Sequence, residues 1–474
     1  MKGNAMKKYL PYIGSGVFLL LAAVIMIFKP FSPDLSDQGQ MVIGGLLIAI
    51  GIWIFKPFNL PFSMGGMFLA FFLLVQKLPP AVVFAGFTQS ALWTLIPALF
   101  FGFVLQKTGL GKRIALAIIK LFRPTYLSMI IAWFLIGVIL SILTPSITVR
   151  VAILLPIAVY CCNLFGLEPG SKGNSLLLLT AFAVALVPGT GWLTGALSGP
   201  ILMGMYNSVP GLEGLIDFSS WFSVAFIPME IVTVILLFGG YLVLKPKEPL
   251  DKDAIAKLKA QKAEPMSRDE KAAGIILVAS FTLFITNSLH GIPDAAVCML
   301  ALVCFFIFKI MNVSEFGTGI SWDLVTFVGV ALGLGAVFAT TGVSTWLAEI
   351  VVPAIKPLAS NPWIFMLVVT TILFAWRFID IATLIPTMAI IVPILPAITQ
   401  AYNISPLVWV PIFVMTVNAF FMAYQNMWAL MSQSIAGEQT WTAKHLGTYG
   451  VVYFVACLIA ICVAVPIYIS MGLL

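Results

Sequence analysis

The stretch of residues 141–156, SILTPSITVRVAILLP, contains the side chains whose types and spacing best fit a binding site. An apolar run enters it, breaks around Pro145 and resumes with one charged residue, Arg150. Proline lacks a backbone N–H and disfavours helix in the preceding residue, so the pattern predicts a helix that stops and restarts. A fixed cation beside a broken helix inside a membrane is a typical receptor for an anion. We therefore predict that Arg150 is the counter-ion of an anionic substrate.

The charge of Arg150 also has a structural interpretation. An arginine at membrane depth costs about 2.5 kcal/mol or more, so it needs a partner. That partner is either the substrate or a carboxylate such as Glu230, in a structural salt bridge. Both alternatives stay open on the sequence.

A second interrupted segment has its break around residues 380–386. When Pro156 is aligned with Pro393, Thr383 and Thr387 take the places of Ser146 and Arg150. Arg377 and Asp380 stand three residues apart beside this break and can pair on one helical face. Alternatively, Asp380 is a proton or cation site.

The composition places both breaks inside a membrane protein. Of the 474 residues, 61% are hydrophobic and 9% are charged, and the mean hydropathy is +1.09. Many runs are long enough to cross a bilayer as helices. The net charge of +7 comes from loops between these runs, so it predicts orientation rather than nucleic-acid binding. We predict an all-α polytopic protein with its N-terminus in the cytoplasm.

The order of apolar runs predicts a repeat. We expect residues 1–40 to hold an N-terminal segment and first span, and residues 245–271 to form a cytoplasmic linker. Two sets of five spans flank that linker, residues 41–244 with a re-entrant hairpin at 126–165 and residues 272–474 with a hairpin at 362–397. This makes about 11 transmembrane helices plus two hairpins. Because five is odd, the second set is inverted and the C-terminus is external, as in secondary transporters.

Three further features of the sequence bear on the expected arrangement. Residues 107–123 carry five basic and no acidic residues and are predicted to form one interfacial amphipathic helix. Asp323 is expected to lie solvated near the end of a span. The six cysteines show no metal-ligand spacing.

Enzymatic chemistry has little support. The polar segments hold no acid/base pair, nucleophile motif or metal cluster, and the chain contains no GxGxxG or P-loop. We therefore predict a transporter with no cofactor and no nucleic-acid partner.

Several motifs resemble the divalent anion:sodium symporter family, in particular its branch of plastid oxoglutarate/malate translocators and bacterial citrate/succinate antiporters. These motifs are Lys107 to Ala115, Pro145 to Arg150, Leu193 to Ala196, Ser288 to Ile292 and Tyr424 to Asn426. The resemblance covers nearly the whole chain. It implies a homodimer with a scaffold domain and a moving transport domain, hence an elevator mechanism.

The residues at the two breaks and the resemblance together predict the site. The predicted substrate-binding residues are Ser146, Ile147, Thr148, Arg150, Thr190, Thr194, Thr383, Thr387 and Asn426, and the predicted cation or proton residues are Asp380, Ser146 and Gly199. The predicted substrate is a small di- or tricarboxylate such as succinate, malate, citrate or oxoglutarate. The predicted location is the bacterial inner membrane.

This chain departs from the family at both hairpin tips. The family's tips carry Ser-Asn-Thr, which helps to bind sodium and the substrate carboxylate. Here Ile147 and Leu384 stand in the asparagine positions and provide no side-chain oxygen. Na⁺ and H⁺ both remain possible coupling ions, and we expect exchange or proton coupling through Asp380 in preference to sodium symport. The alternatives are a sulfate or organosulfonate transporter, a cation/proton antiporter using Asp380, and a non-transporting sensor.

Overall fold

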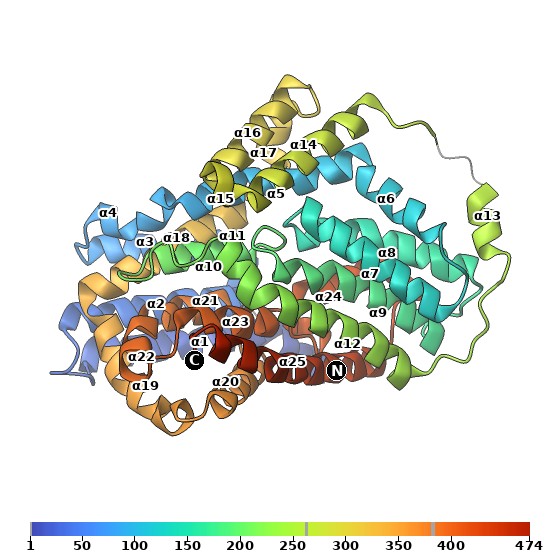
Figure 1. Ribbon diagram of the computed structural model, residues 1–474. Coiled ribbons are helices and arrows are strands. Elements are labelled where there is room, and N and C mark those ends of the chain that lie inside the picture. The colour runs from blue at the N-terminus through green and yellow to red at the C-terminus, as the bar shows by residue number, and fades with distance from the viewer. Residues whose placement is uncertain (1, 261–263, 381–383) are drawn as a thin grey trace.

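The computed structural model describes residues 2–260, 264–380 and 384–474, and every regular element in these ranges is a helix (Figure 1). Ten of the described helices are long and apolar enough to cross a membrane. The predicted all-α polytopic class is therefore confirmed. The orientation of the termini stays a prediction.

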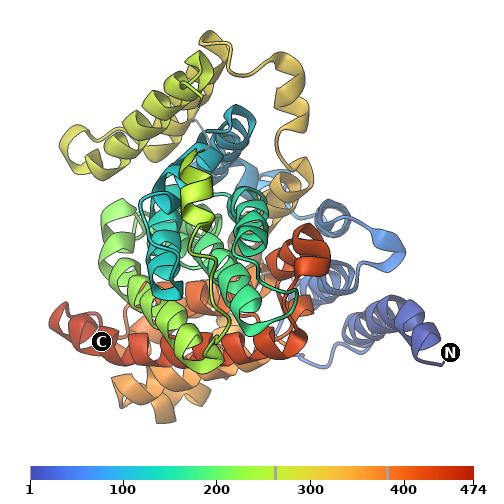
Figure 2. The same ribbon diagram turned by 90° about the vertical axis from the view of Figure 1, so that its right-hand side faces the viewer.

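The first half of the chain forms a series of helices that ends at residue 244. Its members are α1 (Lys2–Phe28), α2 (Asp37–Phe55), α3 (Phe62–Val75), α4 (Pro80–Val83), α5 (Ser90–Thr108), α6 (Leu110–Ile119), α7 (Tyr126–Leu143), α8 (Ile147–Leu164), α9 (Lys172–Leu186), α10 (Ser198–Asn207), α11 (Phe218–Trp221) and α12 (Ile227–Leu244). Helix α1 packs on α2 and lies at the edge of the molecule in Figure 2. The linker adds a short helix, α13 (Ala254–Ala260).

The second half contains a comparable series. Its members are α14 (Arg268–Ile285), α15 (Asn287–His290), α16 (Asp294–Ile307), α17 (Val313–Thr318), α18 (Trp322–Thr341), α19 (Val343–Ala359), α20 (Pro362–Trp376), α21 (Ile385–Ile391), α22 (Leu395–Tyr402), α23 (Trp409–Val417), α24 (Met427–Ala436) and α25 (Ala443–Ser470). In each half a long helix meets a shorter one at a glycine with positive φ: α5 meets α6 in the first half, and α18 meets α19 in the second. A helical pair follows, α7 with α8 or α20 with α21. Next comes a helix broken in the middle, α9 with α10 or α23 with α24.

Contacts between the halves are reciprocal. Helix α3 packs on α18, and its counterpart α16 packs on α5. Likewise α8 packs on α24, α21 packs on α10, and the long helices α12 and α25 pack on each other. This exchange of partners is what a pseudo-twofold axis between two repeats produces. The boundaries of the predicted repeats stay a prediction.

The first helical pair turns inside the protein. Pro145 lies between α7 and α8, and the neighbouring Thr144 and Ser146 are buried. Loops between two full crossings would lie in water, so a buried turn favours the predicted re-entrant form. The turn between α20 and α21 includes residues 381–383, which lie outside the described residues.

The predicted interfacial helix at 107–123 is wrong in its boundary. Lys107 and Thr108 end α5, and the amphipathic helix α6 runs from Leu110 to Ile119. Gly109 separates the two helices with a φ of +78°, and Gly342 does the same between α18 and α19 with a φ of +75°. A glycine adopts this left-handed conformation readily, so it caps one helix and re-aims the next.

Candidate functional site

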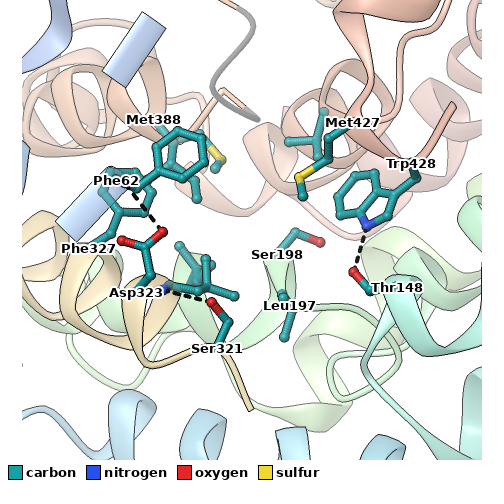
Figure 3. A pocket seen from close by; sticks show the side chains of 14 residues that line it. Phe62, Thr148, Leu197, Ser198, Ser321, Asp323, Phe327, Met388, Met427 and Trp428 are labelled. Carbon is teal, nitrogen blue, oxygen red and sulfur yellow. Dashed lines mark hydrogen bonds between the residues drawn. The ribbon is translucent and has the colours of Figure 1, made fainter. Parts of the chain in front are cut away.

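A cavity of about 290 Å³ lies where the helical pairs and broken helices meet α3 and α18 (Figure 3). One wall comes from α3 and α18 with the residue that precedes α18, and the other comes from α8, α10, α21, α23 and α24. The lining residues are Phe62, Thr148, Leu197, Ser198, Ile201, Ser321, Asp323, Leu324, Phe327, Ile385, Met388, Val417, Met427 and Trp428.

Four helix N-termini reach this cavity. Thr148 is the second residue of α8, and Ser198, Ile385 and Met427 are the first residues of α10, α21 and α24. A helix N-terminus carries unpaired N–H groups and about half a positive charge. The four termini come from both halves of the chain, and together they create a positive potential suited to an anion.

Two hydroxyls stand on the hairpin side of the cavity. The Thr148 hydroxyl oxygen accepts a hydrogen bond from Trp428 Nε1 at 3.1 Å, which leaves its own proton for another acceptor. Ser198 Oγ is buried and has no hydrogen-bond partner among the described residues. Figure 3 places both on the same side of the cavity as Trp428. A bound anion would supply the missing acceptor.

The opposite wall carries a carboxylate. Asp323 accepts hydrogen bonds from the backbone N–H groups of Phe62 at 3.3 Å and Ser63 at 2.6 Å, at the start of α3. Figure 3 shows the bond from Phe62. Asp323 is therefore near a helix end, as expected, but it lies in the cavity wall rather than in bulk solvent. Its negative charge biases an anion towards the hairpin side.

Arg150 is fully buried behind the first tip and does not line the cavity. Its Nε donates to Ala185 O at 2.7 Å, and its Nη1 donates to Thr144 O and Gly195 O at 2.6 Å each. Only Nη2 has no partner among the described residues. The salt bridge with Glu230 is absent there, since neither carboxylate oxygen of Glu230 has a hydrogen-bond partner in the described ranges. Contact between Arg150 and substrate stays a prediction.

The second tip contains a buried arginine as well. Arg377 Nη1 donates to the backbone carbonyl of Asp380, and its Nη2 donates to Gln425 O at 2.6 Å. The Asp380 carboxylate accepts a hydrogen bond from the Thr387 hydroxyl, which itself accepts from Trp376 Nε1 at 2.9 Å. Thr387 thus lies on the side of α21 away from the cavity. Thr383 lies outside the described residues.

The other residues of the first tip stabilise its local structure. Ser146 caps α8, since its hydroxyl oxygen accepts from Val149 N at 3.3 Å. Ile147 is buried and does not line the cavity. Within this tip, the cavity therefore receives Thr148 but not the two residues before it.

The residues predicted in the broken helices lie between α9 and α10 and before α24. Thr190 donates to Val187 O at 2.7 Å and accepts from Asn418 Nδ2 at 3.3 Å, which joins the two breaks. Asn426 caps α24 by accepting from Trp428 N at 3.1 Å and Ala429 N. Thr194 is buried in the loop before α10.

Gly199 permits a close approach of two backbone segments. A Cβ at this position would lie 1.9 Å from Leu193 O, so no other residue fits. This contact folds the loop back on the start of α10, which places Ser198 at the cavity.

Sequence reasoning missed Ser198, Trp428 and the wall formed by Asp323 and Phe327. Ser198 had a local signal, because it begins a Ser-Gly-Pro triplet, and glycine and proline both weaken a helix. The α3 and α18 wall had none, since it depends on helices about 260 residues apart packing together.

Helical pairs and broken helices around an internal cavity define the class of polytopic membrane transporters. Two solved transporters share this fold. The Alcanivorax borkumensis YdaH transporter aligns with a TM-score of 0.58 and 14% identity over 98% of each chain. Neisseria gonorrhoeae MtrF, described among antimetabolite efflux pumps, aligns with a TM-score of 0.57 and 14% identity over 94% of this chain and 97% of that one.

The chain belongs to the family described as the sodium:sulfate symporter transmembrane region, whose profile matches residues 13–470. The predicted family is thereby confirmed, and membership supports anion transport by a multi-pass membrane protein rather than enzymatic activity.

Two relatives have names that state a substrate class. Dicarboxylate transporter 1 of Spinacia oleracea chloroplasts is 25% identical over 73% of this chain and 62% of that protein. The putative malate transporter YflS of Bacillus subtilis is 23% identical over 56% of this chain and 57% of that protein. The chain thus aligns with about three fifths of the length of these relatives.

Proposed function

We propose that this protein is a secondary transporter that carries small organic dianions across a membrane. The observation that supports it is the meeting of four helix N-termini at one cavity that also holds two hydroxyls. Such a site offers carboxylate oxygens two hydroxyl groups and the positive potential of the helix ends, without a cation in its lining. Arg150 and Arg377 lie behind the tips, so their charges act on the cavity through the loops they bind.

The cavity favours a dicarboxylate over sulfate. Its lining is largely aliphatic and aromatic, with Leu197, Ile201, Met388 and Phe327 among its residues. A dicarboxylate has an apolar middle to set against such side chains, whereas sulfate has none. The names of the chloroplast and Bacillus relatives agree with this substrate class.

Competition for uptake tests the substrate class. Proteoliposomes loaded with succinate should take up labelled succinate, and external malate or oxoglutarate should reduce that uptake while sulfate should not. Strong inhibition by sulfate, with none by dicarboxylates, would contradict the proposal.

The position of the cavity supports an elevator motion. The helix termini lie on one wall, whereas Asp323 and Phe327 lie on the wall formed with α3. Sliding the first wall past the second would carry the anion with the groups that bind it. The homodimer, the bacterial inner membrane and the cytoplasmic N-terminus remain part of this proposal.

A cross-link between the two walls tests the motion. In a variant without native cysteines, Leu324→Cys and Ile201→Cys place one thiol on each wall. A bifunctional thiol reagent should stop exchange in the double variant and spare both single variants. Full exchange in cross-linked protein would rule the motion out.

A proton-coupled mechanism through Asp380 is the second candidate. The specific observation is that its carboxylate is buried and accepts from Thr387. Asp380→Asn would then abolish the response of uptake to a pH gradient. We favour exchange, because Asp380 does not line the cavity at which the helix N-termini meet.

A further inference from the structure

Each half of the molecule holds one buried arginine against a cluster of backbone carbonyls. Arg150 binds the carbonyl oxygens of Ala185, Thr144 and Gly195 at 2.6–2.7 Å. All three partners are neutral, so none of these hydrogen bonds cancels the positive charge of the guanidinium.

Arg377 binds a matching set in the other half. Its partners are the carbonyl of Asp380, Gln425 O at 2.6 Å and Val417 O at 3.5 Å. It is 1% exposed, and Arg150 is 0% exposed.

The two carbonyl sets occupy equivalent places. Ala185 and Val417 lie in the last turns of α9 and α23, directly before the breaks in these helices. Gly195 and Gln425 lie in the loops that lead to α10 and α24. Thr144 and Asp380 follow α7 and α20 at the two tips. In both halves, therefore, the end of a half-helix, the loop after it and a tip meet around one cation.

The arginines themselves come from different positions. Arg150 follows its tip, in the first turn of α8, whereas Arg377 precedes its tip and directly follows α20. In the alignment of the two halves Arg150 corresponds to Thr387, so the arginines are not repeat-related. An arginine thus reaches each carbonyl set, but from the second helix of the pair in the first half and from the first helix of the pair in the second half. This indicates that the carbonyl sets require a cation rather than an arginine at one fixed position.

Carbonyl oxygens at the end of a half-helix attract cations for a simple reason. They have no intrahelical donor, and the helix dipole adds about half a negative charge there. Broken transporter helices bind monovalent cations with such ends. Gly189 makes the room for a side-chain cation here, since a Cβ at this position would lie 2.5 Å from Arg150 Nη2.

We propose that Arg150 and Arg377 are resident cations in two carbonyl sites that would otherwise need a mobile monovalent cation. The inference deepens the proposed function and rests on it for its consequence. A resident cation cannot leave with the anion, so transport has no cation-binding step and sodium is not a co-substrate.

Removing one guanidinium should open its site to an ion. In purified Arg150→Ala, sodium chloride should raise the melting temperature by about 2 °C or more over choline chloride at equal concentration. The wild-type protein should show no difference between the two salts. Arg113→Ala is the matched control, because Arg113 binds Glu270 and the carbonyl of Glu264 outside the spans and faces no helix-end carbonyl set.

Two further variants keep the test decisive if Arg150→Ala does not fold. Arg150→Gln is neutral but longer and should gain the same sodium response, whereas Arg150→Lys keeps the charge and should not. A sodium response of the wild type equal to that of the variants, or none in any folded neutral variant, would overturn the inference. Because no dicarboxylate is present, these results stand even if the protein fails to transport dicarboxylates.

Discussion

At the scale of single residues, Ser198 makes the clearest prediction about the substrate. Its buried hydroxyl has no partner in the described protein and faces the cavity. A hydrogen bond to a charged group contributes about 1.5–3 kcal/mol, so Ser198→Ala should raise the apparent KM for a dicarboxylate about tenfold or more with an unchanged maximal rate. Initial rates of exchange at graded substrate concentrations measure this.

The control for this variant is Ser280→Ala. Ser280 is equally a buried serine, but its hydroxyl donates to Ile276 O within α14, away from the cavity. If both variants, or neither, shifted KM, Ser198 would not be a substrate contact.

Gly189 makes a prediction about packing. An added Cβ would lie 2.4 Å from Gly195 O and 2.5 Å from Arg150 Nη2, so Gly189→Ala must displace the guanidinium. Overpacking of this kind costs about 1–3 kcal/mol, and the melting temperature should fall. Gly16→Ala is the comparison, because a Cβ there meets nothing within 4 Å. Equal melting temperatures for the two variants would contradict the tight fit around Arg150.

At the scale of elements, one ion pair connects α6 to α14. Arg113 Nε and Nη2 donate to the two carboxylate oxygens of Glu270 at 2.7 and 3.0 Å. Glu270 also accepts from Ser267 N in the capping box of α14. The hydrogen bonds from Arg113 hold the pKa of Glu270 below its usual range.

The sign of the pH effect follows from that lowered pKa. The pair stabilises the folded protein above the unfolded-state pKa of about 4.3 and loses this contribution as the pH falls through the folded-state value. Glu270→Gln should therefore lower the melting temperature at pH 7 and converge with the wild type in acid. Glu438→Gln, at an exposed glutamate, is the control and should leave the melting temperature at the wild-type value at both pH values. Parallel curves for wild type and Glu270→Gln would refute the assignment.

The sequence predicted those elements whose cause is local. The break around Pro145 is such a case, because proline acts on its own backbone and on the residue before it, and α7 ends just before it at Leu143. It did not predict which carbonyls Arg150 binds, since these come from three segments joined only by folding. Asp323 was missed as a cavity residue for the same reason, because its partners Phe62 and Ser63 lie in the other half.

At the scale of the whole molecule, the two halves contribute equally to one site. Helices α8 and α10 come from the first half and α21 and α24 from the second, and reciprocal packing brings their N-termini together. The carbonyl ends of α9 and α23, the half-helices that precede α10 and α24, are occupied by arginines. The positive ends of α8, α10, α21 and α24 thus face the cavity, whereas the carbonyl ends of α9 and α23 already hold a cation. This division of roles predicts a carrier that exchanges anions without sodium.

Counterflow in proteoliposomes tests this central claim most directly. The vesicles are loaded with unlabelled dicarboxylate or with buffer alone, and uptake of labelled dicarboxylate is followed with sodium or choline outside. We predict fast uptake only into vesicles loaded with dicarboxylate, at the same rate in sodium and in choline. Uptake into empty vesicles that requires external sodium would contradict the account.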